Sequence, residues 1–373
     1  MRYLKFILLI ILFAGCEEYF VPDVDSANPI YAFEGYVTDQ PGPYRVRVMK
    51  INSYNASIPY ETVTNAKVII QCMEDRYAID YTLTYDTTGY YYTAPDAFTG
   101  KVGNSYRLKV ITADGKEFAT EYENMMASAD ISLITSEYAE KRVPASDGSS
   151  YYDQLEHGIQ LLVSSDLGYN MYRPDFKQGN SPYYRYDCNL VFQTHQHYPV
   201  VPNPFDYYIF RPYKPQGYLY IANANEYEHN HITNKKLFFI PSKTIFAKNE
   251  TLAEGVEFEL QHCAVFVKVT QYSMSENQYK YWEAVADQLD NPNYIFGKIE
   301  NQAVGNIKCQ TDESEPALGY FCVSSVKQAY KGVSLSKYKK VTYECDIDEH
   351  QFPNLDSTVV YTSMPWFTLS LSN

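Results

Sequence analysis

The chain has 373 residues, a formal net charge of −14 and 16% aromatic residues, among them 39 tyrosines. This acidic balance argues against nucleic-acid binding and against a basic patch that holds anionic lipids. The length exceeds what one hydrophobic core usually covers, so we expect two domains. Tyrosine suits strands and also binding surfaces, so the composition leaves open whether the rings pack internally or form a glycan or peptide platform.

The first residues predict a secretory signal that ends at a cysteine. Arg2 and Lys5 precede a short apolar run, Phe6–Phe13, and Ala14-Gly15-Cys16 follows. A positive start, an apolar stretch too short to span a bilayer and small residues before a cysteine are typical of such signals. The order Phe-Ala-Gly-Cys resembles a bacterial lipobox. We therefore expect a signal peptide over residues 1–15 and lipidation of Cys16; an ordinary signal peptide or a short buried helix is the alternative.

Residues 16–29 are predicted to form a lipidated N-terminus and a linker. Acyl chains such as palmitate on Cys16 would anchor the protein to a membrane that it does not cross. Glu17 and Glu18 follow directly and resemble an export signal for the outer face of the outer membrane, although acidic residues also suit a solvated tether. Loss of Arg2 and Lys5 with the signal would lower the net charge by two, from −14 to −16.

Residues 30–126 are predicted to form a β-sandwich. Apolar and polar residues alternate in four stretches, which is the pattern of half-buried strands: Tyr44–Val48, Ala66–Cys72, Ile79–Asp86 and Tyr106–Val110. Turn-forming residues separate them, and Asp114-Gly115 is a strong hairpin signal. Short strands at this spacing, with no helical stretch, favour an immunoglobulin-like or transthyretin-like fold.

Residues 127–373 are predicted to form a larger β-rich domain. Alternation returns near residues 159–163, 183–191, 218–221 and 237–240. The polar stretch between Glu137 and Asp153 is interpreted as a loop. The proline-rich stretch 198–208 cannot form a central strand, because proline lacks the N–H that a sheet interior requires.

One strand and one amphipathic helix organise this second domain. Alternating apolar residues from Cys263 to Val269 predict a strand, and the spacing then changes to three and four residues. Ser275 is the expected helix cap, with Gln278 at the capping-box position. The helix is predicted at about residues 275–290. Its buried face is predicted to consist of Tyr279, Trp282, Ala286 and Leu289, which assigns them to packing.

Several segments together resemble a known family. They are EGYVTDQPGPYRVRV from Glu34, ADGKEF from Ala113, YYRY from Tyr183, QYSMSENQYKYW from Gln271, GNI from Gly305 and LGYFCVSS from Leu318. The pattern is similar to the Bacteroidota lipoprotein family catalogued as domain of unknown function 4249. The resemblance implies an envelope location and genes beside TonB-dependent receptors with carboxypeptidase-regulatory-like domains. It implies no particular reaction. Gly305, Asn306 and Gly319 in these motifs are interpreted as backbone requirements.

Six cysteines remain after the signal: Cys72, Cys188, Cys263, Cys309, Cys322 and Cys345. An exported protein meets an oxidising compartment, so disulfides are permitted, and fifteen complete pairings are possible. The sequence selects none of them. Cys72, Cys263 and Cys322 lie in the apolar phase of predicted strands, so buried free thiols are the alternative.

Two His-x-His pairs are the candidates for a metal site. These are His195 with His197 and His229 with His231; Glu226 and Glu228 precede the second pair. On a strand, residues two apart share a face, so each pair could present two imidazoles to one ion. Polar side chains on loops or strand edges are the alternative. We expect no metal or other cofactor.

The sequence contains no nucleophile, nucleotide-binding or zinc-protease motif, so no catalytic residue is assigned. We expect a non-enzymatic, surface-exposed outer-membrane lipoprotein that serves a TonB-dependent transport system. A stand-alone glycan- or peptide-binding lipoprotein is the second hypothesis. A hydrolase with two carboxylates is the third, and it requires a close acid pair with a raised pKa.

Overall fold

The computed structural model describes residues 29–52, 60–74, 76–146, 151–166, 180–198, 205–215, 219–241, 250–252, 256–258, 261–290 and 303–334. In these ranges the chain is mainly β, with several sheets and one α-helix, as predicted. No helix among these residues is both long and apolar enough to cross a membrane. The predicted signal peptide, Cys16 and the linker lie outside the described residues.

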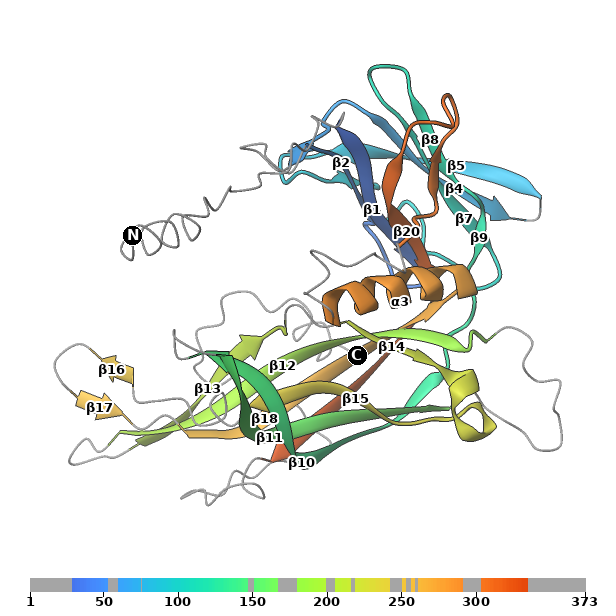
Figure 1. Ribbon diagram of the computed structural model, residues 1–373. Coiled ribbons are helices and arrows are strands. Elements are labelled where there is room, and N and C mark those ends of the chain that lie inside the picture. The colour runs from blue at the N-terminus through green and yellow to red at the C-terminus, as the bar shows by residue number, and fades with distance from the viewer. Residues whose placement is uncertain are drawn as a thin grey trace, which may run out of the picture.

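The first lobe is one strongly curved sheet (Figure 1). Its N-terminal strands are β1 (Ile30–Thr38), β2 (Arg45–Ile51), β3 (Tyr60–Thr62), β4 (Lys67–Glu74), β5 (Tyr77–Tyr85), β6 (Tyr91–Tyr92), β7 (Ser105–Ile111), β8 (Glu117–Thr120) and β9 (Glu123–Asn124). Val46, Ile70 and Leu108, from the predicted alternating stretches, are buried in its core. Gly115 has a φ of +84° in the turn between β7 and β8, which confirms the predicted hairpin.

Two strands from much later in the chain complete this sheet. They are β19 (Ile307–Cys309), which pairs with β8, and β20 (Ala317–Ser324), which pairs with β1. The β1–β20 pairing is parallel and runs from Tyr31 opposite Ala317 to Thr38 opposite Ser324. A parallel pair needs a long connection, and here the connection contains most of the second lobe. The predicted domain 127–373 is therefore interrupted, because β19 and β20 belong to the first lobe.

The chain around β19 and β20 brings the two ends of the curved sheet together. The Asn306 side chain imitates a strand backbone: its Nδ2 donates to the Phe321 carbonyl and its Oδ1 accepts from the Phe321 N–H, both at 2.9 Å. Gly319 has a φ of +94°, and a Cβ there would lie 1.9 Å from the Phe33 carbonyl oxygen. A Cβ at Gly305 would lie 2.1 Å from the Gly319 carbonyl oxygen. The predicted backbone roles of Gly305 and Gly319 are thus confirmed, whereas Asn306 acts through its side chain.

The second lobe packs two sheets face to face. One contains β10 (Asp130–Ser146), β11 (Tyr151–Asp166) and β15 (Ile232–Pro241), and the other contains β12 (Tyr183–Tyr198), β13 (Phe205–Tyr213), β14 (Tyr220–Asn223), β18 (Gln261–Met274) and β21 (Val326–Ser334). Their shared core includes Leu161, Leu190 and Val267. A small hairpin, β16 (Glu250–Leu252) and β17 (Val256–Phe258), and the 3-10 turns η2 (Ala224–Glu226) and η3 (Glu228–Asn230) complete the described elements.

The predicted loop between Glu137 and Asp153 is wrong. Strands β10 and β11 stay paired from Asp130 opposite Asp166 to Ser146 opposite Tyr151. The pairing of these strands does not depend on an alternating apolar face, as the 54% exposed side chain of Tyr138 illustrates. Residues 198–208 were predicted not to form a central strand. Their described part, from Phe205 onward, agrees with this: it begins β13, which pairs with β12 alone among the described strands and so lies at a sheet edge.

Helix α3 (Glu276–Asp290) lies between the two lobes (Figure 1). Ser275 caps it, since the Gln278 N–H donates to Ser275 Oγ at 3.2 Å. The Gln278 side chain does not complete a capping box; its Nε2 lies 3.5 Å from Ser324 Oγ. The predicted face is only partly right. Tyr279 is buried, whereas Leu289 is 54% exposed and Ala284 is buried instead.

Buried polar side chains on β18 join the two lobes. Two of the chain's crossings between the lobes meet at β18: one at residues 125–129 and a second at Ser325, between β20 and β21; a further crossing lies between α3 and β19. Ser273 Oγ donates to the Met126 carbonyl at 2.7 Å and accepts from the Ser325 N–H at 2.8 Å. Gln271 Nε2 donates to the Ala129 carbonyl at 2.6 Å. Both side chains are fully buried, so Ser273 holds both crossings at once.

Asp39, at the end of β1, fixes the second crossing from the opposite side. Its carboxylate accepts from Ser325 Oγ at 2.6 Å and from the Val326 N–H at 2.8 Å. Hydrogen bonds to an ionised carboxylate are roughly twice as strong as those between neutral groups. We call Asp39, Gln271, Ser273 and Ser325 the lobe junction.

Ser273→Ala tests the lobe junction. The substitution leaves the Met126 carbonyl and the Ser325 N–H without their shared hydroxyl, and a buried polar group left unsatisfied costs about 1–3 kcal/mol. We expect the free energy of unfolding, measured by urea denaturation, to fall by about 2–3 kcal/mol. Ser314→Ala is the control, because Ser314 is exposed and its hydroxyl bonds Asp312. Equal effects of the two substitutions would contradict this role for Ser273.

Candidate functional site

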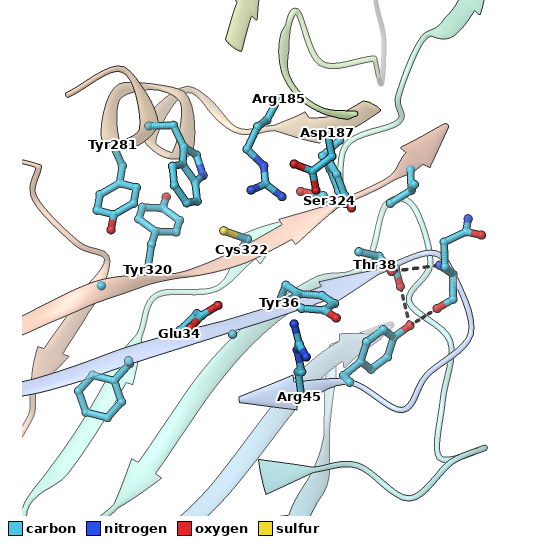
Figure 2. Close-up of a pocket in the computed structure, with 18 of the residues that line it drawn as sticks. Glu34, Tyr36, Thr38, Arg45, Arg185, Asp187, Tyr281, Tyr320, Cys322 and Ser324 are labelled. Atoms are coloured by element: carbon cyan, nitrogen blue, oxygen red, sulfur yellow. Dashed lines mark hydrogen bonds between the residues drawn. The ribbon is translucent and has the colours of Figure 1, made fainter. Parts of the chain in front are cut away.

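A cleft of about 790 Å³ lies between the lobes (Figure 2). Strands β1 and β20 form its floor on the first lobe, and β12, β18 and α3 face them from the second lobe. This volume is typical of pockets that bind small ligands. We call it the interlobe cleft.

Strand alternation decides which side chains reach the interlobe cleft. On β1, Phe33 and Val37 are buried in the first-lobe core, so Glu34 and Tyr36 between them point outward and line the cleft. On β12, residues 184 and 186 are buried tyrosines, so Arg185 and Asp187 take the opposite face and also line it.

Arg185 lies in an aromatic cage. Its Cζ is 4.6 Å from the ring centre of Tyr272 and 5.1 Å from that of Trp282, so two cation–π contacts fix the guanidinium. Arg185 Nε is buried and has no hydrogen-bond partner among the described residues. Buried donors are almost always paired in folded proteins. The guanidinium of Arg185 is therefore held by ring contacts and leaves part of its hydrogen-bonding capacity unused by its protein neighbours.

Further rings extend this wall along α3. The ring of Tyr281 lies 4.8 Å from that of Tyr320 and 5.2 Å from that of Trp282. Burial raises the pKa of the Cys322 thiol to about 12, so it stays protonated at neutral pH and is a poor nucleophile. Burial, with the charge of Asp187 next in importance, raises the pKa of Tyr272 to about 12.

Both signs of charge line the interlobe cleft. The first lobe contributes Glu34 and Arg45, and the second contributes Arg185 and Asp187, with Lys214 at the rim (Figure 2 labels the first four). The cleft thus carries three cations against two carboxylates, whereas the whole chain has a net charge of −14. Charges of both signs on facing walls suit a ligand that is itself charged at two places.

A second cavity, of about 660 Å³, lies on the other side of Tyr320 and Tyr281, which line both cavities. Its main feature is Glu123, which accepts a hydrogen bond from Ser275 Oγ. Burial raises the pKa of Glu123 to about 7. The hydrogen bond from Ser275 favours the ionised form and acts in the opposite direction, but burial is the larger effect. Its carboxyl thus touches the cap of α3, and its ionisation affects stability.

Glu123→Gln tests this burial through pH. A carboxyl whose folded pKa is raised binds more protons in the folded state, so the stability it contributes is present below its ordinary pKa and is lost as pH rises to about 7. We expect the variant to match the wild type near pH 4.5 and to be more stable by about 1–3 kcal/mol at pH 8.

Urea denaturation at a series of pH values measures this difference. Glu121→Gln, at the exposed neighbouring carboxylate, removes the same charge and is the control for a general charge effect. A Glu123→Gln variant whose stability relative to the wild type does not change between pH 4.5 and pH 8 would contradict the burial argument.

The structure places the predicted histidines in two separate regions. His195 and His197 lie on β12 opposite Tyr208 and Asp206 of β13, and their side chains are outside the described set. His229 lies in η3 with a positive φ, and His231 follows that turn, so the second pair is not on a strand.

The contacts of the second histidine pair are with single carboxylates. His229 Nδ1 is 3.7 Å from Glu228 Oε1, and His231 Nδ1 is 3.4 Å from Asp166 Oδ1. Within the described ranges, no group of three or more His, Cys, Asp or Glu side chains is placed to hold a metal ion. The candidate pair His195 and His197 is not tested, because both side chains lie outside the described set.

Four of the six cysteines have described side chains: Cys72, Cys188, Cys309 and Cys322. All four are free thiols, and the first three are buried. This agrees with the alternative of buried thiols for Cys72. Cys263 lies on β18 with its side chain outside the described set, and Cys345 is outside the described residues.

The residues that line the interlobe cleft were not predicted as a site. Tyr279 and Trp282 were assigned to packing, and Trp282 instead lines the cleft while Tyr279 is buried. Arg185 and Glu34 belong to the family motifs, but no role was predicted for them. Each lies between residues of the buried face of its strand, and this alternation could have indicated that both side chains point away from the core.

The chain was compared with protein families and with curated proteins. Residues 17–329 match the model of the family described as domain of unknown function, DUF4249. No curated protein matches the chain.

Proposed function

The chain belongs to the DUF4249 family, and from this premise we propose that it is a lipid-anchored, non-enzymatic binding protein of the outer membrane whose ligand occupies the interlobe cleft. One observation carries the proposal. Four of the six segments that carry the family pattern, far apart in the sequence, contribute residues to this cleft: Glu34–Val48, Tyr183–Tyr186, Gln271–Trp282 and Leu318–Ser325.

The chemistry of the cleft supports binding over catalysis. Aromatic faces and fixed charges are the usual elements of a ligand site, and the cage around Arg185 holds its guanidinium in place before a ligand arrives. The Cys322 thiol is protonated at neutral pH. A two-carboxylate hydrolase requires a close acid pair, and the raised pKa of Glu123 arises instead from burial beside the hydroxyl of Ser275.

The proposed location depends on Cys16. Acyl chains at this position contribute about 0.8 kcal/mol per buried methylene, and two or more chains give stable anchoring. Glu17 and Glu18 support display on the outer face. An anchored protein has a high effective concentration near a barrel in the same membrane, which suits an accessory role at a TonB-dependent receptor.

Cys16→Ser tests the anchor. Because acylation needs the thiol, we expect radiolabelled fatty acid to enter the wild-type protein and not the variant, and we expect the variant to leave the membrane fraction. The Cys72→Ser variant, which changes a buried thiol of the first lobe, controls for labelling at other cysteines. Equal labelling of wild type and Cys16→Ser would rule out this anchor.

Affinity purification tests the accessory role. The tagged lipoprotein is recovered from gently solubilised outer membranes, and we expect a TonB-dependent receptor to be enriched with it. The Cys16→Ser variant is the control, because it keeps both lobes and loses the effective concentration that the anchor provides. Recovery without any barrel protein would count against the accessory role and would favour the second candidate, a stand-alone binding lipoprotein. The aromatic wall at Tyr281 and Trp282 is the observation that favours this second candidate.

A further inference from the structure

Each lobe presents both signs of charge to the interlobe cleft, and Lys214 adds a further cation. Glu34 and Arg45 come from β1 and β2, and Arg185 and Asp187 come from β12. A ligand of a single sign would pair with one set and leave charges of the other sign partly desolvated and unmatched, which is unfavourable. A ligand that carries both a cation and an anion can match both sets.

The anion subsite is at Arg185. Its side chain points into the cleft (Figure 2), and the rings of Tyr272 and Trp282 hold it there. Arg185 Nε has no hydrogen-bond partner in the described part of the chain. A carboxylate has two oxygens that accept from a guanidinium in a fork geometry, so it is the anion that this arrangement fits.

The aromatic wall selects among ligands that carry a carboxylate. Tyr36 is 38% exposed, and Tyr281 and Trp282 are partly exposed beside it in the cleft lining. A neutral sugar could stack on these rings but would use none of the charges. A uronic acid would use the cations and would bring a further negative charge close to Glu34 and Asp187. A short peptide supplies a carboxylate, an ammonium group and an apolar side chain together, and a cavity of about 790 Å³ has room for one.

We propose that the interlobe cleft binds short peptides with free termini, with the peptide carboxylate at Arg185 and the peptide ammonium group at Glu34. This inference rests on the proposed function and names the ligand class of the same site. It requires both ends of the peptide, since each lobe recognises one of them.

Tryptophan emission of the full mature chain reports binding directly. The chain contains two tryptophans, Trp282 and Trp366, and Trp282 forms part of the cleft wall. The probe is a random tripeptide pool with free termini. We expect saturable quenching by this pool, and we expect Trp282→Phe to remove the quenching while equilibrium dialysis still shows peptide retained by that variant.

Capped probes and matched variants locate the two ends. We expect C-terminal amidation or N-terminal acetylation of the pool to weaken binding about tenfold or more, as the loss of one charge-assisted contact predicts. Arg185→Gln should weaken the binding of the uncapped pool by a similar factor. It should not change the weak binding of the amidated pool. Arg142→Gln, on the exposed part of β10, makes the same chemical change outside the cleft and should have no effect.

Three results would overturn the peptide inference. The first is equal binding of free and capped pools, and the second is wild-type affinity in Arg185→Gln. The third is quenching by trigalacturonate or cellotriose with none by the free tripeptide pool; this result would leave the cleft as a ligand site and keep the proposed function. Affinity purification tests the receptor role independently of all three.

Discussion

The hydroxyl of Ser273 is the contact on which the arrangement of this molecule depends. It bonds the chain where it leaves the first lobe, at Met126, and where it passes from β20 to β21, at Ser325. Gln271 secures the first crossing and Asp39 the second. Because all of these groups need partners away from water, the lobes cannot separate without leaving several of them unpaired. Two β lobes therefore behave as one folded body.

This constraint gives the interlobe cleft fixed walls. The pairing of β1 with β20 forms one side and the pairing of β12 with β18 the other, so the charged side chains Glu34, Arg185 and Asp187 are placed by sheet geometry. The guanidinium of Arg185 is held by rings from two different elements, β18 and α3. A site built this way loses little conformational entropy when a ligand binds.

The sequence predicts the local features of this fold well and the nonlocal ones poorly. Period-two alternation located nine of the 21 described strands, and Ser275 was recognised as a cap, because both depend on neighbouring residues. The β10–β11 hairpin was missed, since the sequence between Glu137 and Asp153 shows no apolar alternation. The interruption of the second domain was missed because no local signal says that β20 pairs with β1. For the interlobe cleft, alternation along β12 predicts that the Arg185 side chain points away from the core, but it does not predict that β1 and β20 lie opposite it.

Dissection of the first lobe tests the central claim most directly. A fragment of residues 30–126 lacks β19 and β20, whereas the same fragment joined by a flexible linker to residues 303–324 regains both. If β20 is an integral strand of this sheet, the short fragment will show no cooperative unfolding and no protection of the β1 amides from hydrogen exchange, and the joined fragment will show both. Cooperative unfolding of residues 30–126 alone, with protected β1 amides, would contradict the account.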